Sequence, residues 1–283
     1  MKKTLIALLM VLLCAMLIIS CSNEPKDEGS STTPTETPAT SSYTVTFDLN
    51  GGSGNISAQT VVKDGKATKP ATNPTPSNAN HYVFEFWAKE GETTEFDFAN
   101  TAITANTTLV AKWKNKYKVG DTGPGGGTIF YVADTEQTSV WGSDSLTWKY
   151  LEAAPSNLNV TYAWGTMGAK NAGTGIGTGW SNNLTLSGDA FPAAKACRDY
   201  GNGSDYDDWF LPSKDELLAM YEKRTEIGGF LNTSTVIYWS SSESINSTTD
   251  PQSAAAAVVN FNTGICYDNP RSNAGNVRPI RAF

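Results

Sequence analysis

The sequence is poor in the residues on which most enzyme sites depend. It has one histidine, His81, and four cysteines, with neither a C-x-x-C pair nor a G-x-S-x-G motif. His81 lies in a turn-rich segment far from any candidate nucleophile. We therefore predict a surface loop position for it, and histidine-based catalysis and His-ligated zinc are excluded. The Gly173-x-Gly175-x-Gly177-x-Gly179 run lacks the spacing and context of a dinucleotide fingerprint, so no cofactor is expected.

Positive charge is scarce as well. The chain has 21 basic and 28 acidic residues, and charged residues make up only 17% of it. Loss of Lys2 and Lys3 with a signal peptide would leave 19 basic residues and a formal net charge of −9. Nucleic acids and anionic lipid surfaces both need a basic patch, so neither is expected as a partner. A local basic spot remains compatible with this balance.

The chain also lacks an apolar run of the roughly 20 residues that a membrane-spanning helix needs. Leu5–Ile19 has fifteen apolar residues after Lys2 and Lys3, which is typical of a secretory signal. Ile18-Ile19-Ser20-Cys21 resembles the lipobox of bacterial lipoproteins, which implies that Cys21 is acylated after cleavage. An ordinary signal peptide with an incidental cysteine is the alternative. Ser22 is not Asp, which under the common sorting rule implies the outer membrane.

We therefore predict a lipoprotein signal peptide over residues 1–20 and a disordered tether over 21–42. The tether has no aromatic residue and no aliphatic residue larger than Ala, so it cannot bury enough apolar surface to fold. The protein is expected in the cell envelope, exposed at the surface and attached to the membrane through lipid on Cys21.

Residues 43–114 form the first predicted folded block. Tyr43–Leu49 alternates β-forming residues and ends at the turn Asn50-Gly51-Gly52. The block resembles the Listeria–Bacteroides repeat, also called the internalin B-repeat. The matching segments are VTFDLNGG at Val45–Gly52, VKDGKATKP at Val62–Pro70, FEFW at Phe84–Trp87, EFDF at Glu95–Phe98 and TLVAKW at Thr108–Trp113. The resemblance implies a small β-grasp-like spacer.

Residues 117–283 form the second block. We predict helices over Ser187–Tyr200 and from Ser213, where Ser213 and Glu216 match the S-x-x-E capping box. Thr161–Asn183 is rich in Gly and Asn and is predicted to be a long loop. Strands are predicted over Val236–Ser241 and Ala256–Phe261.

Four segments of this block resemble the C-terminal domain of the Legionella collagen-like adhesin family. They are Asp208–Leu217, Tyr238–Glu243, Val259–Gly264 and Val277–Arg281. The resemblance implies a C-type-lectin-like α/β fold, and with it an α+β fold class for the chain. It also implies surface adhesion or ligand binding rather than catalysis. The related formylglycine-generating enzymes use a cysteine pair near the C-terminus, where this chain offers only Cys266.

Two cysteines remain in the second block. An exported compartment permits a bond between Cys197 and Cys266. Two buried free thiols are the alternative.

Two polar-aromatic segments are the candidates for ligand binding, because aromatic rings beside amides and charges suit carbohydrate or protein contacts. The first is a predicted loop with Tyr267, Asp268, Asn269 and Arg271. The second is the Gly-rich loop with Trp164, Trp180, Asn182 and Asn183.

Some neighbouring residues have structural interpretations. Trp209 and Trp239 are predicted in the core. Asp208 could pair with Arg278 or Arg281, or join Asp205 and Asp207 as oxygen ligands of calcium, although no EF-hand spacing is present.

The sequence thus predicts a lipid-anchored surface protein that binds a glycan or a host protein and is not an enzyme. The alternatives are an enzyme of the formylglycine-generating type and a structural envelope lipoprotein.

Overall fold

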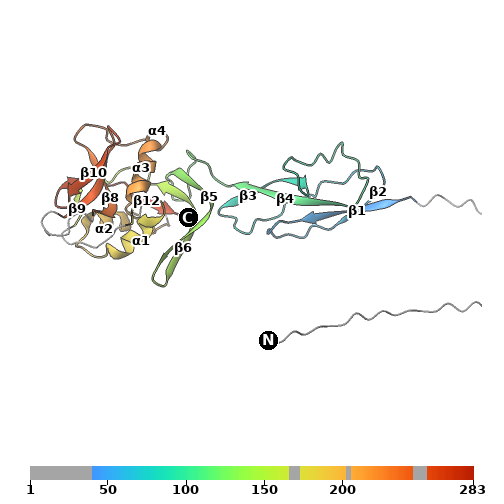
Figure 1. Ribbon diagram of the computed structural model, residues 1–283, viewed down its shortest axis with the longest axis horizontal. Helices are drawn as coiled ribbons and strands as arrows, with labels where there is room; N and C mark the ends of the chain where they lie inside the picture. Colours follow the sequence, from blue (N-terminus) through green and yellow to red (C-terminus); the bar gives the residue numbers. More distant parts are fainter. Residues whose placement is uncertain (1–39, 166–172, 202–204, 245–253) are drawn as a thin grey trace, which may run out of the picture. The chain divides into compact units, whose positions relative to one another are not determined.

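The computed structural model describes residues 40–165, 173–201, 205–244 and 254–283 (Figure 1). The predicted signal peptide and lipid-bearing Cys21 lie outside these ranges. Ser41–Phe283 form one compact unit. Within the described ranges, no helix is both long and apolar enough to cross a membrane.

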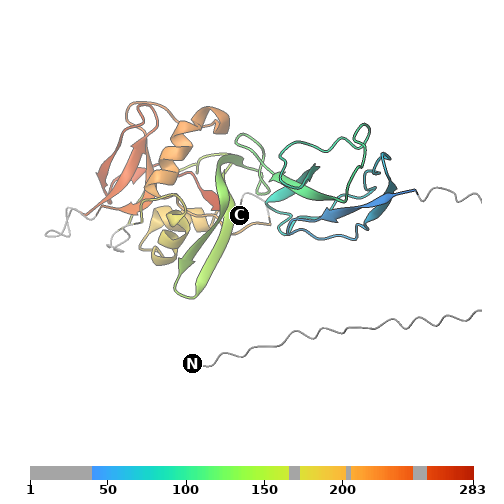
Figure 2. The same cartoon turned by 45° about the vertical axis from the view of Figure 1, so that its right-hand side comes forward.

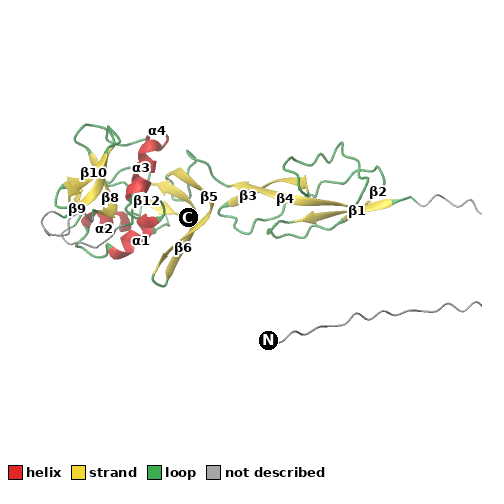
Figure 3. Cartoon of the chain, in the orientation of Figure 1, coloured by secondary structure: helices red, strands yellow, loops and turns green. Residues whose placement is uncertain are grey.

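Strands dominate the fold, with 37% of residues in strands and 12% in helices (Figure 3). The predicted α+β class with a C-type-lectin-like domain is therefore wrong, and the described chain is built from four small sheets. The helices are few because the segments expected to supply them are interrupted. Pro192 opens a helix of only seven residues where Ser187–Tyr200 had been expected.

The repeat block forms one four-stranded sheet in the order β2-β1-β4-β3. Its strands are β1 (Ser42–Asp48), β2 (Gln59–Val62), β3 (Tyr82–Lys89) and β4 (Thr107–Asn115). β1 runs parallel to β4, and the other neighbours are antiparallel. Asn50 and Gly51 both have positive φ, which forms the predicted turn after β1. Val45, Trp87 and Leu109 are buried in a core between the sheet and its long connections.

The second block has three sheets, and Figure 2 shows the long hairpin of β5 and β6 as a green ribbon. The orders are β12-β6-β5, β10-β9-β8 and β11-β7. The strands are β5 (Thr128–Trp141), β6 (Asp144–Ala153), β7 (Tyr162–Ala163), β8 (Ile237–Glu243), β9 (Ala255–Asn260), β10 (Cys266–Pro270), β11 (Ala274–Gly275) and β12 (Ile280–Ala282). The helices are α1 (Thr178–Thr185), α2 (Pro192–Arg198), α3 (Lys214–Glu222) and α4 (Arg224–Ile227).

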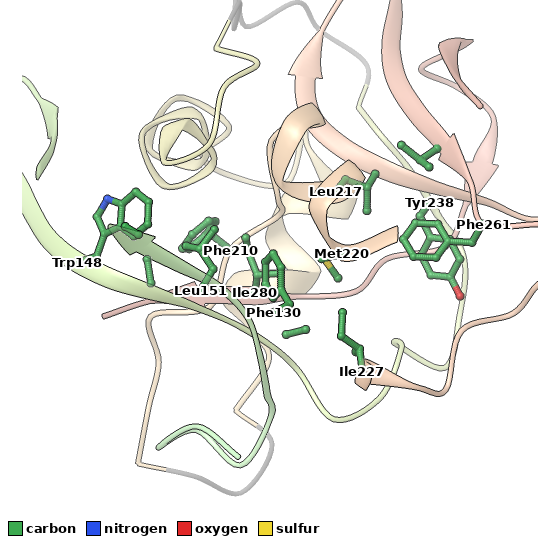
Figure 4. Packing of buried hydrophobic residues seen from close by; sticks show 14 residues of the cluster. Phe130, Trp148, Leu151, Phe210, Leu217, Met220, Ile227, Tyr238, Phe261 and Ile280 are labelled. Carbon is green, nitrogen blue, oxygen red and sulfur yellow. The ribbon is translucent and has the colours of Figure 1, made fainter. Parts of the chain in front are cut away.

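Two apolar clusters fill this block, one on each face of β9. The first, the α3 cluster, joins the β5–β6 hairpin through α3 to β8 and β9 (Figure 4). The second, the α2 cluster, packs α2 against Trp239 and Val258. Val258 and Val259 point to opposite faces, as neighbouring residues of a strand do. The predicted core positions are confirmed, because Trp209 is 1% exposed and Trp239 is fully buried.

The capping box that opens α3 is also confirmed. The Ser213 hydroxyl accepts from the backbone N–H of Glu216, and the Glu216 carboxylate accepts from that of Ser213. Elsewhere the local predictions need correction. Part of the predicted Gly-rich loop is helix α1, and the predicted loop from Tyr267 is strand β10.

His81 is buried, with 3% of its surface exposed, so its predicted surface loop position is wrong. Its Nδ1 lies 2.6 Å from Glu136 Oε1, and its carbonyl accepts from the Tyr150 hydroxyl at 2.6 Å. The same hydroxyl accepts from the backbone N–H of Lys116 at 2.9 Å. His81 therefore helps to hold the repeat to the β5–β6 hairpin. Its partners lie 55 and 69 positions along the chain, which a local pattern does not reveal.

Candidate functional site

Two exposed apolar side chains lie at β10, the edge strand of its sheet: one on the strand and one on the residue just before it. β10 pairs with β9 on one side, with Tyr267 opposite Val258 and Cys266 opposite Val259. Cys266 packs against the α3 cluster. Ile265 is 60% exposed and Tyr267 is 43% exposed. Ile265 directly precedes β10 and Tyr267 is the second residue of the strand, so the two exposed apolar side chains lie close together and form one small patch.

Polar groups on β10 flank this patch. The Asp268 carboxylate accepts from the Ser244 hydroxyl at 2.6 Å, which fixes its orientation. The Asn269 side-chain oxygen accepts from Asn273 Nδ2 at 3.1 Å. The side-chain nitrogen of Asn269 has no hydrogen-bond partner in the part of the chain that the structure describes. We use the name β10 patch for the apolar pair together with these two polar residues: Ile265, Tyr267, Asp268 and Asn269.

Arg271, which the sequence groups with these residues, has a different position. Its guanidinium is buried and lies 2.6 Å from Glu243 Oε1 and 5.5 Å from the centroid of the Trp164 ring. Trp164 is 1% exposed, and its indole N–H donates to the carbonyl of Ser240 at 2.8 Å. Both residues therefore support the strands behind β10 and are not open to a ligand.

The second predicted segment does not form a common surface. Trp180 lies on α1 and packs against the α3 cluster, on the other side of the β8–β9 sheet from Trp164. Asn183 is buried and exchanges two hydrogen bonds with the backbone of Leu211, at 2.7 and 3.0 Å. Asn182 is also buried, and its amide donates to the carbonyl of Gly173 at 2.7 Å. These amides tie α1 to its neighbours.

An open groove of about 410 Å³ beside α2 was not found by sequence reasoning. Tyr162, Asp189 and Tyr200 line it, together with an i,i+4 ion pair between Lys195 and Asp199 on α2. Ala193, Ala194 and Cys197 of the same helix point into the core. The spacing of these three buried residues could have indicated which face of α2 points outward. The tyrosines of the groove lie outside the helix, so the spacing within α2 does not reveal them. Two carboxylates, Asp189 and Asp199, and one ammonium, Lys195, line the groove and leave it one net negative charge.

The predicted disulfide needs correction, because Cys197 and Cys266 are both free thiols. Cys197 belongs to the α2 cluster, whereas Cys266 packs against the α3 cluster, on the opposite face of the sheet. Burial raises the pKa of the Cys266 thiol and raises that of Cys197 well above its usual value. Both therefore stay protonated and poorly nucleophilic near neutral pH. This lends no support to the cysteine-dependent formylglycine chemistry.

The acidic cluster near Asp208 forms a salt-bridge network. Arg281 donates to both oxygens of Asp208 at 2.8 Å and approaches Glu152 Oε2 at 3.3 Å. Of the two arginines that the sequence leaves open, Arg281 is therefore the partner. Glu152 is fully buried and also accepts from the N–H groups of Gly125 and Gly127. In the described ranges, no three His, Cys, Asp or Glu side chains are grouped so that they could hold a metal ion.

Glu216 is a second buried carboxylate with backbone partners. It accepts from the N–H of Ser213 at 2.7 Å and from that of Gly177 at 2.8 Å, and so ties α3 to the Gly-rich segment. Burial raises its pKa from 4.5 to about 7. A side chain on Gly179 would lie 2.1 Å from the Glu216 carboxylate, so the close approach requires glycine there.

This pKa shift predicts a pH dependence of stability. The folded pKa lies above the unfolded value, so the folded state holds the proton more tightly. The contribution is fully present below pH 4.5 and is lost as the pH rises to about 7. We expect the loss to be about 3 kcal/mol of unfolding free energy. Urea unfolding of the parent and of Glu216→Gln at several pH values measures it, because other titrating groups cancel in the difference. An equal pH slope in both proteins would contradict the prediction.

Two family models match the chain. Residues 43–112 match the Listeria-Bacteroides repeat domain, and residues 130–281 match the Lcl C-terminal domain. No curated protein matches. The two domains and the sheet-rich fold define a cell-surface, adhesin-like protein. The second match covers more than half of the chain, which therefore belongs to the Lcl C-terminal domain family. Both family resemblances predicted from the sequence are confirmed.

Proposed function

We propose that this protein is a lipid-anchored adhesin that binds a glycan or a host protein through the β10 patch. The observation that supports this most is the exposure of Ile265 and Tyr267 beside strands β8 and β9, which are almost wholly buried. Tyrosine is enriched among the residues that dominate binding energy at interfaces. The neighbouring Asp268 is exposed and adds a carboxylate able to orient a ligand.

The support behind the patch favours binding with little rearrangement. Arg271, Glu243 and Trp164 form a buried ion pair and a cation–π contact close to β10. Asp268 is held by Ser244. A surface fixed before binding loses less conformational entropy when a ligand binds. Arg271, Glu243 and Trp164 are therefore positioning residues, and the exposed side chains of the β10 patch make the contact.

The remaining parts of the chain would present this patch away from the cell. Residues 21–42 are the proposed flexible tether and residues 43–112 are a single repeat, which would act as a spacer. The signal peptide and lipobox support export and anchoring at the outer membrane, with the lipid on Cys21.

Replacement of Cys21 tests the anchor. We expect Cys21→Ala to abolish acylation, so that the protein stays uncleaved or is released from the membrane. Fractionation, detergent partitioning and the mass of the mature N-terminus measure this. Cys197→Ala is the control and should be processed like the parent. A Cys21→Ala protein that is still cleaved and still partitions into detergent would contradict the proposed anchor.

A binding screen tests the adhesive function. Detergent-solubilised full-length protein would be applied to arrays of glycans and of extracellular host proteins. The proposal expects at least one saturable ligand whose binding persists after reduction, because both described cysteines are free. Absence of any saturable ligand would favour the structural envelope role instead.

A further inference from the structure

Strand β10 has a second edge, on the side away from β9. The order of its sheet is β10-β9-β8, so within the described ranges β9 is the one strand that pairs with β10 (Figure 1). Residue pairs alternate along two antiparallel strands. One pair exchanges two backbone hydrogen bonds, and in the next pair the N–H and C=O groups point away from the partner strand. The phase of this alternation therefore decides which backbone groups of β10 face the open edge.

Two backbone hydrogen bonds at the ends of the strand fix this phase. The N–H of Asn260 donates to the carbonyl of Ile265 at 3.0 Å, and the N–H of Arg271 donates to that of Ala254 at 3.2 Å. Both pairs continue the antiparallel register between β9 and β10, so every second residue of β10 is bonded to β9. The residues between them, whose N–H and C=O groups face the open edge, are Cys266, Asp268 and Pro270.

The position of Pro270 agrees with this phase. Proline has no N–H, so a sheet accepts it where that group would face away from the neighbouring strand. Ala255 lies opposite Pro270 on β9, and its carbonyl accepts from the N–H of Ser244, the residue after β8, at 3.0 Å. That carbonyl thus points away from β10, as the alternation requires. The open edge then offers the N–H donors of Cys266 and Asp268 and the carbonyl acceptors of these two residues and Pro270.

The side chains of β10 do little to guard this edge. Edge strands are often protected from pairing by lysine, and β10 has none. Its one charged side chain is Asp268, which accepts from the Ser244 hydroxyl. Tyr267 on the strand and Ile265 just before it are exposed. An extended peptide beside β10 would therefore cover apolar surface while its main chain pairs. A basic side chain opposite Asp268 would complement its charge.

We propose that β10 binds an extended segment of a protein partner, which adds to the sheet as an antiparallel strand. In this mode of recognition, main-chain hydrogen bonds supply affinity and alternate side chains supply specificity. The segment carries a basic residue opposite Asp268, with apolar residues on both sides of it that face Tyr267. The inference rests on the proposed function and narrows it to a protein ligand, because a glycan has no main chain that pairs with a strand.

The test uses detergent-solubilised full-length protein and a cyclic β-hairpin peptide whose outer strand reads Thr-Val-Lys-Val-Thr. The hairpin is already extended, so it loses little conformational entropy when it binds. We expect saturable binding, measured by fluorescence polarisation of the labelled hairpin. The same hairpin with N-methyl groups on the outward amides of Thr, Lys and Thr should bind more than about tenfold more weakly, because its donors are lost.

Two variants of the protein separate the main chain of β10 from the carboxylate. Asp268→Pro and Asp268→Ala both lose the charge, but only the proline also removes the outward N–H, in phase with Pro270. We expect Asp268→Pro to bind the hairpin about tenfold more weakly than Asp268→Ala. Melting temperatures show whether both variants are folded. The comparison of the two hairpins on the parent protein decides the question if Asp268→Pro is not.

The inference is overturned if the parent does not bind the hairpin, or if the N-methylated hairpin binds equally well. A folded Asp268→Pro protein that binds like Asp268→Ala overturns it too. Sedimentation of the parent tests another occupant of the edge. An assembly that Asp268→Pro dissociates would show that β10 pairs with a second copy of the chain, which also contradicts a protein partner.

Failure of this inference is distinguishable from failure of the proposed function. The ligand found in the binding screen would be measured against Asp268→Pro and against Ile265→Ala with Tyr267→Ala. Loss of affinity in the second variant alone would show that the β10 patch makes the contact without strand pairing. That result overturns the inference and leaves the proposed function standing.

Discussion

Arg281→Gln should lower the unfolding free energy by about 3–5 kcal/mol, the usual cost of removing one partner of a buried ion pair. Arg281 is 3% exposed, and it is the only cation that the described structure places against the fully buried Glu152. Without the guanidinium, Glu152 keeps only the N–H groups of Gly125 and Gly127. Asp208 would lose both of its 2.8 Å bonds at the same time.

Packing adds to this effect. The Arg281 guanidinium lies 3.9 Å from the centroid of the Tyr206 ring and 5.0 Å from that of Phe283. Urea unfolding followed by fluorescence measures the loss. Arg224→Gln is the matched control, because Arg224 is exposed and lies over the Tyr221 ring at the surface. We expect that control to stay within about 1 kcal/mol of the parent. Equal effects of the two variants would contradict the assignment of a buried network.

Trp239→Ala should cost about 3–5 kcal/mol, as expected for truncation of a buried aromatic side chain. Trp239 is fully buried in the α2 cluster, and its indole N–H donates to the carbonyl of Tyr162 at 2.9 Å. Its ring lies so close to Gly275 that a side chain there would come within 2.6 Å of the indole nitrogen. The close fit leaves little room for neighbours to collapse into the space.

The control for Trp239 is a large apolar residue of the same sheet region that faces solvent. Ile265→Ala removes a side chain that is 60% exposed, so its cost should stay within about 0.5 kcal/mol. Thermal and urea unfolding of the two variants measure the contrast. A loss below about 1 kcal/mol for Trp239→Ala would show that the α2 cluster is not packed as described.

The sequence predicted the family and much of the core because the recognisable motif residues are the ones that hold the fold. Asp208 pairs with Arg281, Trp209 is buried, and Ser213 with Glu216 closes the cap of α3. These are local patterns with a direct physical meaning. The same fact explains why the motifs do not locate a ligand, since Asp208 is exposed but Trp209, Ser213 and Glu216 are buried, and they form no common surface.

The misassigned residues depend on contacts between distant segments. Tyr267 was placed in a loop, but its pairing with Val258 makes it part of an edge strand. Arg271 and Trp164 were expected to meet a ligand, but each is buried by a partner from another segment. Local composition records that a residue is polar or aromatic. It does not record which surface another part of the chain will cover.

The predictions of the disulfide and of the fold class were wrong for related reasons. An exported compartment permits disulfides, so two cysteines in one domain suggest a bond. However, α2 and β10 place the thiols of Cys197 and Cys266 on opposite faces of one sheet. The sequence predicts one helix over Ser187–Tyr200, but Pro192 sets a later start and the helix is shorter than predicted. The groove beside α2 combines residues from separate parts of the chain, so it was not anticipated as a site.

The central claim is that the β10 patch makes the adhesive contact, and one measurement tests it most directly. Affinity for the ligand found in the screen would be compared between the parent and Ile265→Ala with Tyr267→Ala. Val140→Ala with Leu231→Ala is the control, because these side chains are 63% and 51% exposed and lie off β10. We expect the β10 variant to keep the parent's melting temperature and lose about thirtyfold in affinity, as for an interface hot spot. The control should bind like the parent. Full affinity in the β10 variant would contradict the account and move the contact to another surface, first of all the groove beside α2.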